Sequence, residues 1–140
     1  MKTASKWASR LIISLLALVC FSSCETDDDI GYGLSGAFGK VWYGDFGAED
    51  DHGYPLYSEL FFSSGRDNSY GTGWEKTYYQ DNGEPAYSDN FDWEVVNGVL
   101  YLHFQYQGDL EIYDYFVGAT YFKGRFSNGN WFELYLDRQW

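Results

Sequence analysis

The chain of 140 residues has only two cysteines, Cys20 and Cys24, and both lie near its N-terminus. A domain that follows them has no disulfides and no cysteine metal ligands, so its core alone has to stabilise it. Basic residues are also scarce, because nine Lys and Arg stand against 21 Asp and Glu, a net charge of −12. Nucleic-acid-binding proteins carry basic patches, so this composition argues against that class of partner.

A long apolar run is missing as well. The run over residues 11–19 is only nine residues long, whereas a membrane-spanning helix needs about 20. It follows Lys2, Lys6 and Arg10, and a basic start before a short apolar run is typical of an export signal. We therefore predict a lipoprotein signal peptide over residues 1–23, an N-terminal signal helix ahead of the folded domain.

The signal ends in Phe21-Ser22-Ser23-Cys24, with small residues directly before a cysteine. This pattern resembles the lipobox of bacterial lipoproteins, which implies cleavage before Cys24 and lipidation of its thiol. Two alternatives are cleavage before Cys20 and a plain signal peptide without a lipid. We expect the lipid at Cys24 to be the membrane anchor, because two or more acyl chains make anchoring stable.

An acidic run that includes Asp27, Asp28 and Asp29 follows Cys24. It resembles the export tag of surface lipoproteins of Bacteroidota, which implies display on the outer face of the outer membrane. The other interpretation is a solvated tether, because like charges repel and extend a chain. Both can hold together, and we predict an acidic lipidated tether over residues 24–35.

Removal of residues 1–23 leaves 117 residues, enough for one domain, which we place at residues 36–140. Six basic and 21 acidic residues remain, a formal charge of −15. The full chain has 14 Tyr, 11 Phe, 6 Trp and 16 Gly. Aromatic residues favour strands and glycine suits turns, so this composition predicts an all-β domain.

The clearest strand pair surrounds Asn97-Gly98, the preferred dipeptide of a two-residue hairpin turn. This turn sets Trp93 opposite Leu102 on an apolar face and Asp92 opposite His103 on a polar face. A second hairpin is predicted around Asn128-Gly129-Asn130. A three-residue loop there pairs Phe126 with Phe132, Gly124 with Leu134, Phe122 with Leu136 and Arg125 with Glu133.

We predict eight strands joined by short hairpins. They cover residues 39–46, 57–63, 69–79, 90–96, 99–106, 109–115, 119–126 and 131–138. Such a meander closes into an eight-stranded antiparallel up-and-down barrel, and a two-layer sandwich is the main alternative. We expect side chains to fill the barrel interior, and no segment shows helical periodicity.

Several segments resemble small uncharacterised Bacteroidota lipoproteins that are described as lipocalin-like. The resemblance implies a calycin-type barrel, in which a Trp near the first strand packs against an Arg near the last, here Trp42 and Arg138. It implies no substrate. The segments that carry it are Gly39–Phe46, Ser58–Phe62, Gly71–Gly73, Phe91–Trp93 and Phe132–Arg138.

No motif predicts an enzyme, a metal site or a cofactor. His103 beside Asp92 could act as a general base, but chance pairing is the better interpretation in so acidic a chain. The segment from Glu49 to Gly53 could offer carboxylates to Ca²⁺, although a solvated loop fits its spacing better. Asp67-x-Ser69-x-Gly71 is interpreted as a hairpin turn.

Aromatic side chains are the one unusual resource for binding, since exposed Tyr and Trp make good contact anchors. The simpler alternative is that Tyr rings pack at the barrel rim with wet hydroxyls. We expect a non-enzymatic surface lipoprotein that binds a protein or glycan partner, then a carrier of a small apolar ligand inside the barrel, and last a hydrolase. The candidate binding aromatics are Tyr43, Trp74, Tyr78, Tyr101 and Tyr113.

Overall fold

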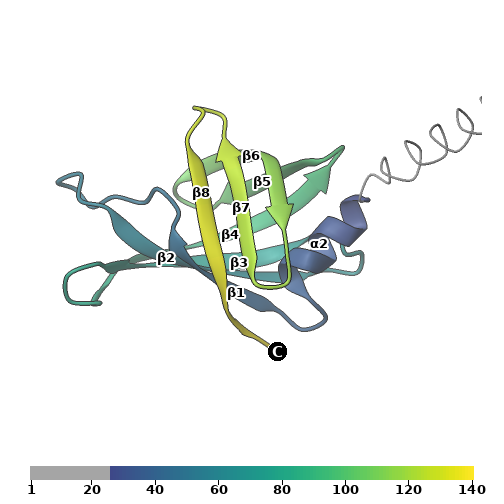
Figure 1. The fold of residues 1–140 in the computed structure, drawn as a ribbon, viewed down its shortest axis with the longest axis horizontal. Coiled ribbons are helices and arrows are strands. Elements are labelled where there is room, and N and C mark those ends of the chain that lie inside the picture. Colours follow the sequence, from purple (N-terminus) through teal and green to yellow (C-terminus); the bar gives the residue numbers. More distant parts are fainter. Residues whose placement is uncertain (1–25) are drawn as a thin grey trace, which may run out of the picture.

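In a computed structural model of the chain, which describes residues 26–140, eight antiparallel strands close into a barrel (Figure 1). Each strand pairs with its neighbours in the chain, and β1 pairs with β8. The predicted up-and-down barrel is confirmed, and the sandwich alternative is wrong. The elements are α2 (Asp27–Ser35), β1 (Lys40–Asp45), β2 (Leu56–Ser64), β3 (Tyr70–Tyr79), β4 (Pro85–Val96), β5 (Val99–Phe104), β6 (Gly108–Val117), β7 (Tyr121–Phe126) and β8 (Trp131–Gln139).

The eight predicted strands agree with the observed ones within two residues at most ends, and β4 is the largest difference. It begins at Pro85, five residues before the predicted start. Proline is tolerated as the first residue of a strand, so the chain here extends the sheet although its sequence lacks apolar alternation. The longer β4 forms, with β2 and β3, the part of the barrel that projects beyond β5–β8 in Figure 1.

The hairpin around Asn97-Gly98 has the predicted register. Trp93 pairs with Leu102, and Asp92 pairs with His103. Both turn residues have positive φ, 50° for Asn97 and 78° for Gly98, as this type of turn requires.

The register predicted for the C-terminal hairpin is wrong by two residues. Phe122 pairs with Leu134 and Lys123 with Glu133. The loop has the predicted three residues, but they are 127–129 rather than 128–130, because the Phe126 N–H donates to the Asn130 carbonyl at 2.9 Å. A shift of two residues leaves the same side chains on the inner face. Apolar patterning alone therefore could not separate the two registers.

Inward-facing aromatic rings fill one half of the barrel. Trp42, Phe62, Trp93 and Phe122 are at most 1% exposed, and Phe62 contacts Trp93 and Phe122 at centroid distances of 5.9 and 6.2 Å. At this end the prediction of a filled interior is confirmed.

Helix α2 closes the filled end of the barrel (Figure 1). Ile30 and Leu34 are buried against the core. Thr26 caps the helix, since its side chain accepts from the Asp29 N–H while the Asp29 carboxylate accepts from the Thr26 N–H. Residues 27–35 of the predicted acidic tether over residues 24–35 therefore form a helix packed on the barrel, and an extended solvated chain is wrong for them.

The acidic run has a structural role in this helix. The Asp27 carboxylate accepts from the N–H groups of Asn97 at 3.1 Å and Gly98 at 3.0 Å, so it joins α2 to the β4–β5 turn. The predicted signal helix and Cys24 lie outside the described residues. Within residues 26–140, no helix has the length and apolar character needed to cross a membrane.

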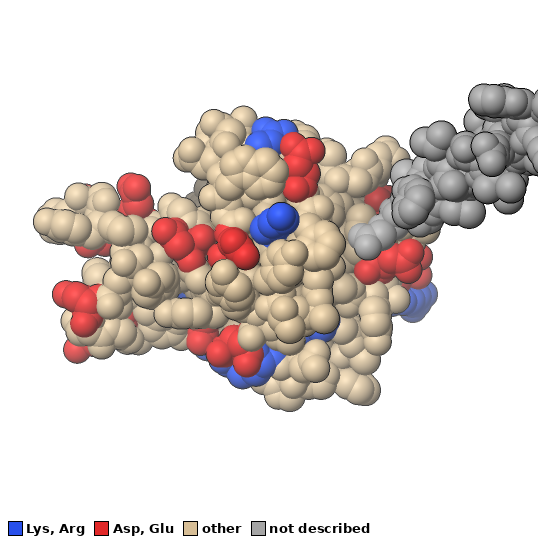
Figure 2. Space-filling model, viewed as in Figure 1, with Lys and Arg blue, Asp and Glu red and all other residues tan. Residues whose placement is uncertain are grey.

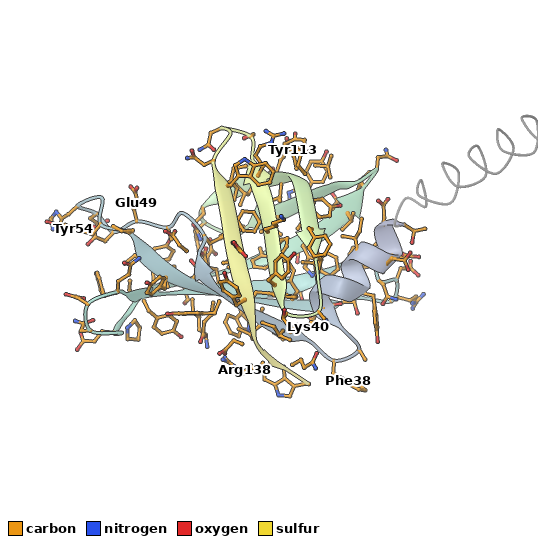
Figure 3. The ribbon with its side chains drawn as sticks, viewed as in Figure 1. Phe38, Lys40, Glu49, Tyr54, Tyr113 and Arg138 are labelled. Atoms are coloured by element: carbon orange, nitrogen blue, oxygen red, sulfur yellow. The ribbon has the colours of Figure 1, made fainter. Side chains whose placement is uncertain are left out.

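The pairing of Trp42 with Arg138, implied by the resemblance, is wrong. Trp42 points inward, and its indole N–H donates to the Leu34 carbonyl at 2.9 Å. Lys40 Nζ lies 5.7 Å from its ring centroid. Arg138 points outward (Figure 3) and pairs with Glu59 and Asp137.

Candidate functional site

The first group of candidate aromatics lies on the outer face of β1–β3. The rings of Tyr43 and Tyr57 are 5.5 Å apart. The Tyr78 hydroxyl donates to Glu59 Oε2 at 3.2 Å, and Glu59 also accepts from Arg138 at 3.4 Å. This arrangement holds the rings against the sheet with polar atoms toward solvent.

Trp74 lies on the same outer face, farther along β2 and β3. Its ring stacks on Phe61 at 5.4 Å with an interplanar angle of 23°. Lys76 Nζ is 4.4 Å from the Trp74 centroid. Trp140 contacts Phe61 edge-on at 5.7 Å, so three rings form one aromatic platform.

A groove of about 500 Å³ runs from this platform across the outer face of β3–β5. Register explains its composition, because Thr72, Asp92 and His103 are cross-strand neighbours in one row, and Trp74 faces Asn90 in the next row. Aromatic rings therefore form one wall, and amide, carboxylate and imidazole groups form the rest. The lining residues are Phe61, Thr72, Gly73, Trp74, Asn90, Phe91, Asp92, His103 and Gln105.

The other two candidate aromatics, Tyr101 and Tyr113, lie on the outer face of β5 and β6. Tyr101 stacks with His103 at 6.2 Å. The Tyr113 hydroxyl donates to Glu111, and Arg125 lies 5.5 Å from the Tyr113 centroid. Figure 3 places Tyr113 and Arg138 on opposite sides of the barrel. The five predicted aromatics thus belong to two surfaces, and the groove begins at Trp74.

The imidazole of His103 is not paired with Asp92. Its Nδ1 is 3.0 Å from Asp109 and its Nε2 is 3.2 Å from Glu94. Hydrogen bonds to Asp109 and then to Glu94 raise the pKa of His103 above its usual value. With both ring nitrogens engaged, the arrangement resembles a surface ion-pair network more than a general base.

The raised pKa of His103 predicts a pH-dependent contribution to stability. The unfolded imidazole has a pKa of about 6.5, so the ion pairs stabilise the fold fully below that pH and are lost as pH rises through the folded pKa. NMR titration should give a midpoint above about 6.5 that falls in Asp109→Asn. A midpoint unchanged by that substitution would contradict the assignment.

The end of the barrel opposite α2 is open. A cavity of about 930 Å³ lies there between the β1–β2, β5–β6 and β7–β8 connections. The prediction of a filled interior is wrong at this end, where phenylalanine rings line the cavity and do not fill it. Apolar walls come from Phe46, Phe104, Leu110, Phe126 and Phe132, and the acids are Asp45, Glu75, Asp109 and Glu133.

Two acidic side chains are buried near this open end. Glu75 is 2% exposed and Asp89 is 4% exposed. Glu75 accepts from the Ser58 hydroxyl at 2.7 Å and from Gln107 Nε2 at 3.1 Å. Asp89 Oδ2 accepts from the N–H groups of Tyr106 and Gln107, both at 3.1 Å. These bonds hold the β5–β6 turn against the inner face of β3 and β4.

The remaining acidic segments are loops, as predicted. Asp50 Oδ1 accepts from the N–H groups of His52 and Tyr54, each at 2.9 Å, so it organises its own turn at the exposed tip labelled in Figure 3. Asp67 and Ser69 lie in the β2–β3 turn. Across the described chain, no three His, Cys, Asp or Glu side chains are grouped to hold a metal ion.

The sequence pointed to Trp74 and set Asp92 opposite His103, but Asn90, Gln105 and both buried acids were missed. A signal for Glu75 was available, because alternation along β3 places Gly71, Gly73, Glu75 and Thr77 on the inner face. A carboxyl at an inward position needs partners or a ligand.

Comparisons of the chain with protein-family models, with curated proteins and with solved structures found no match. The fold and the two sites therefore rest on the geometry of this chain alone.

Proposed function

We propose that the protein is a non-enzymatic surface lipoprotein that binds a neutral glycan in the groove beside Trp74. The lipid at Cys24 would anchor it in the outer membrane, and the acidic run behind Cys24 would direct it to the cell surface. The observation that carries the proposal is the groove, where an aromatic platform stands beside a row of planar polar side chains.

The chemistry of the groove suits a saccharide. A sugar ring has an apolar face of C–H groups, which packs on an aromatic ring, and an edge of hydroxyls, which need donors and acceptors. Asn90 and Gln105 each offer both, and Asp92 accepts. An open groove with a few convergent polar groups is the usual form of a small-ligand site.

The size and charge of the groove favour a neutral glycan over a protein or an acidic glycan. A standard protein interface involves about 20–30 residues on each partner, whereas nine residues line the groove. Asp92 lies in the groove, and the chain has 21 acidic against nine basic residues. Acidic side chains also gather on the face of β7 and β8 that Figure 2 displays. Acidic sugars would be repelled by such a surface.

Truncation of Trp74 tests this function. Trp74→Ala should weaken binding to neutral glycans on a glycan array by about tenfold or more, because an aromatic anchor contributes about 2 kcal/mol. Tyr113→Ala is the matched control, since it removes a candidate aromatic outside the groove and should leave binding unchanged. The proposal would be contradicted if the protein bound a protein partner and no glycan, or if both variants lost glycan binding equally.

A second candidate is a carrier of a small ligand, which the cavity at the open end favours. The earlier expectation was a purely apolar ligand inside the barrel. The cavity instead combines apolar walls with acidic groups, so an apolar ligand fits only part of its surface.

A further inference from the structure

We propose that the open end of the barrel binds a small amphipathic amine, whose ammonium group pairs with the Glu75 carboxylate while its apolar part packs on the phenylalanine walls. This site is distinct from the groove beside Trp74, which lies on the outer face of the barrel. Its ligand therefore does not depend on the proposed glycan.

The cavity can accept such a ligand in both size and lining. Its volume of about 930 Å³ lies within the range of small-molecule sites. The rings of Phe46, Phe126 and Phe132 contact one another at centroid distances of 4.9–5.2 Å. They form a continuous apolar wall beside the opening, where burial of a hydrocarbon is favourable.

Glu75 supplies the polar end of the site. Its two carboxylate oxygens can accept about four hydrogen bonds, and Ser58 and Gln107 donate only two. No Lys, Arg or His within residues 26–140 forms an ion pair with it. A buried carboxylate without a cation is costly, so an ammonium group in the cavity would complete its coordination.

The charges around the cavity also favour a cation. Glu75 is the acid that faces the interior, while Asp45, Asp109 and Glu133 stand at the outer rim of the opening, where Lys123 is the one basic residue among the lining side chains. Asp89 adds a further buried acid beside Glu75. Acidic groups around a low-dielectric cavity concentrate cationic ligands and repel anionic ones.

Proton binding at Glu75 should compete with the amine. Burial raises the pKa of Glu75, and Asp89 raises it further, although the bonds from Ser58 and Gln107 oppose this. Tyr87 on β4 also faces the pair, and burial beside Glu75 and Asp89 raises its pKa to about 12, so it stays neutral. Lys123 on β7 faces outward at the rim, opposite Glu133. Because protonated Glu75 carries no charge, the preference for an ammonium ligand should weaken as pH falls.

Three probes with the same apolar chain test the proposal: hexylamine, hexanol and hexanoate. The full chain is expressed, and the purified protein is titrated with each probe by calorimetry at about pH 7. It should bind hexylamine at least about tenfold more tightly than hexanol, and hexanoate more weakly than both. Glu75→Gln keeps the side-chain shape and removes the charge. It should bring hexylamine and hexanol within about twofold of each other.

Asp92→Asn is the matched control, because it removes a carboxylate in the groove and should leave the amine preference unchanged. A preference that survives Glu75→Gln, or equal binding of amine and alcohol by the unmodified protein, overturns the proposal. If Glu75→Gln does not fold, the preference of the unmodified protein for hexylamine over hexanol is compared at about pH 7 and about pH 5. Hexylamine is protonated at both values. A shrinking preference supports the role of Glu75, and a constant one overturns it.

Discussion

Gly31→Ala is expected to destabilise the protein by about 3 kcal/mol or more, although alanine is the better helix former by about 1 kcal/mol. A Cβ at Gly31 would lie 1.6 Å from the carbonyl oxygen of Asn68 in the β2–β3 turn. Backbone cannot yield by that much, so α2 would have to leave the barrel end. Ile30 and Leu34 would then lose their burial, and Trp42 would lose its hydrogen bond to Leu34.

Gly33→Ala provides the control within the same helix. A Cβ there would lie 3.1 Å from a Val117 methyl group, a side-chain contact that can relax. Chemical denaturation should show Gly33→Ala close to the parent and Gly31→Ala well below it. Equal stabilities of the two variants would contradict the docking of α2 on the barrel.

Cys24→Ala is expected to abolish metabolic labelling of the protein with radioactive palmitate. The thiol of Cys24 is the expected acceptor of the first lipid, and a methyl group cannot replace it. Since lipid chains would be the whole of the membrane attachment, the variant should also leave the membrane fraction. The measurement is autoradiography of the immunoprecipitated protein after fractionation.

Cys20→Ala is the matched control for the anchor, because Cys20 is the other cysteine of the signal segment. It should keep its label. A label that persists in Cys24→Ala and disappears in Cys20→Ala would move the anchor to Cys20. If both variants kept the palmitate label, lipidation in this segment would be contradicted.

The export role of the acidic run has to be tested apart from folding. Asp29 caps α2 and Asp27 binds the β4–β5 turn, so their replacement would alter the fold as well as the signal. Asp28 lies in the same helical turn and makes no such hydrogen bond with another residue of 26–140. A change of charge at Asp28 therefore tests the export role with the least effect on the fold.

Much of the barrel could be predicted from the sequence because local chemistry determines its strands and turns. Asn97-Gly98 requires a two-residue turn, and that turn sets the register of β4 and β5. The β7–β8 loop contains the same dipeptide, Asn128-Gly129, but only Gly129 has a positive φ there, so the two-residue turn does not form. There the inner face is the same for either register, and only the bond between Phe126 and Asn130 selects the observed one.

Helix α2 could not be predicted, because its stability comes from tertiary contacts. Its sequence contains Gly31 and Gly33, which weaken an isolated helix, and three acidic residues that also suit a solvated tether. Gly31 is needed for the close approach to Asn68. The same residue that obscures the helix in the sequence allows it to pack.

The candidate site was predictable in part. The sequence identified Trp74 and the tyrosines as candidate binding aromatics, but the pairing of β3 with β4 and of β4 with β5 was needed to set Asn90 and Asp92 beside Trp74. The cavity depended on differences in strand length around the barrel. Such differences follow from closure of the sheet rather than from any single segment.

Binding of a neutral glycan at Trp74 is tested most directly by an NMR titration of the protein with a glycan that the array retains. The indole N–H signal of Trp74 and the side-chain amide signals of Asn90 and Gln105 should shift together and saturate, while the buried indole N–H of Trp42 should stay unchanged. Shifts confined to the open end of the barrel or to the face of Tyr101 and Tyr113, with Trp74 unaffected, would contradict a glycan site in the groove.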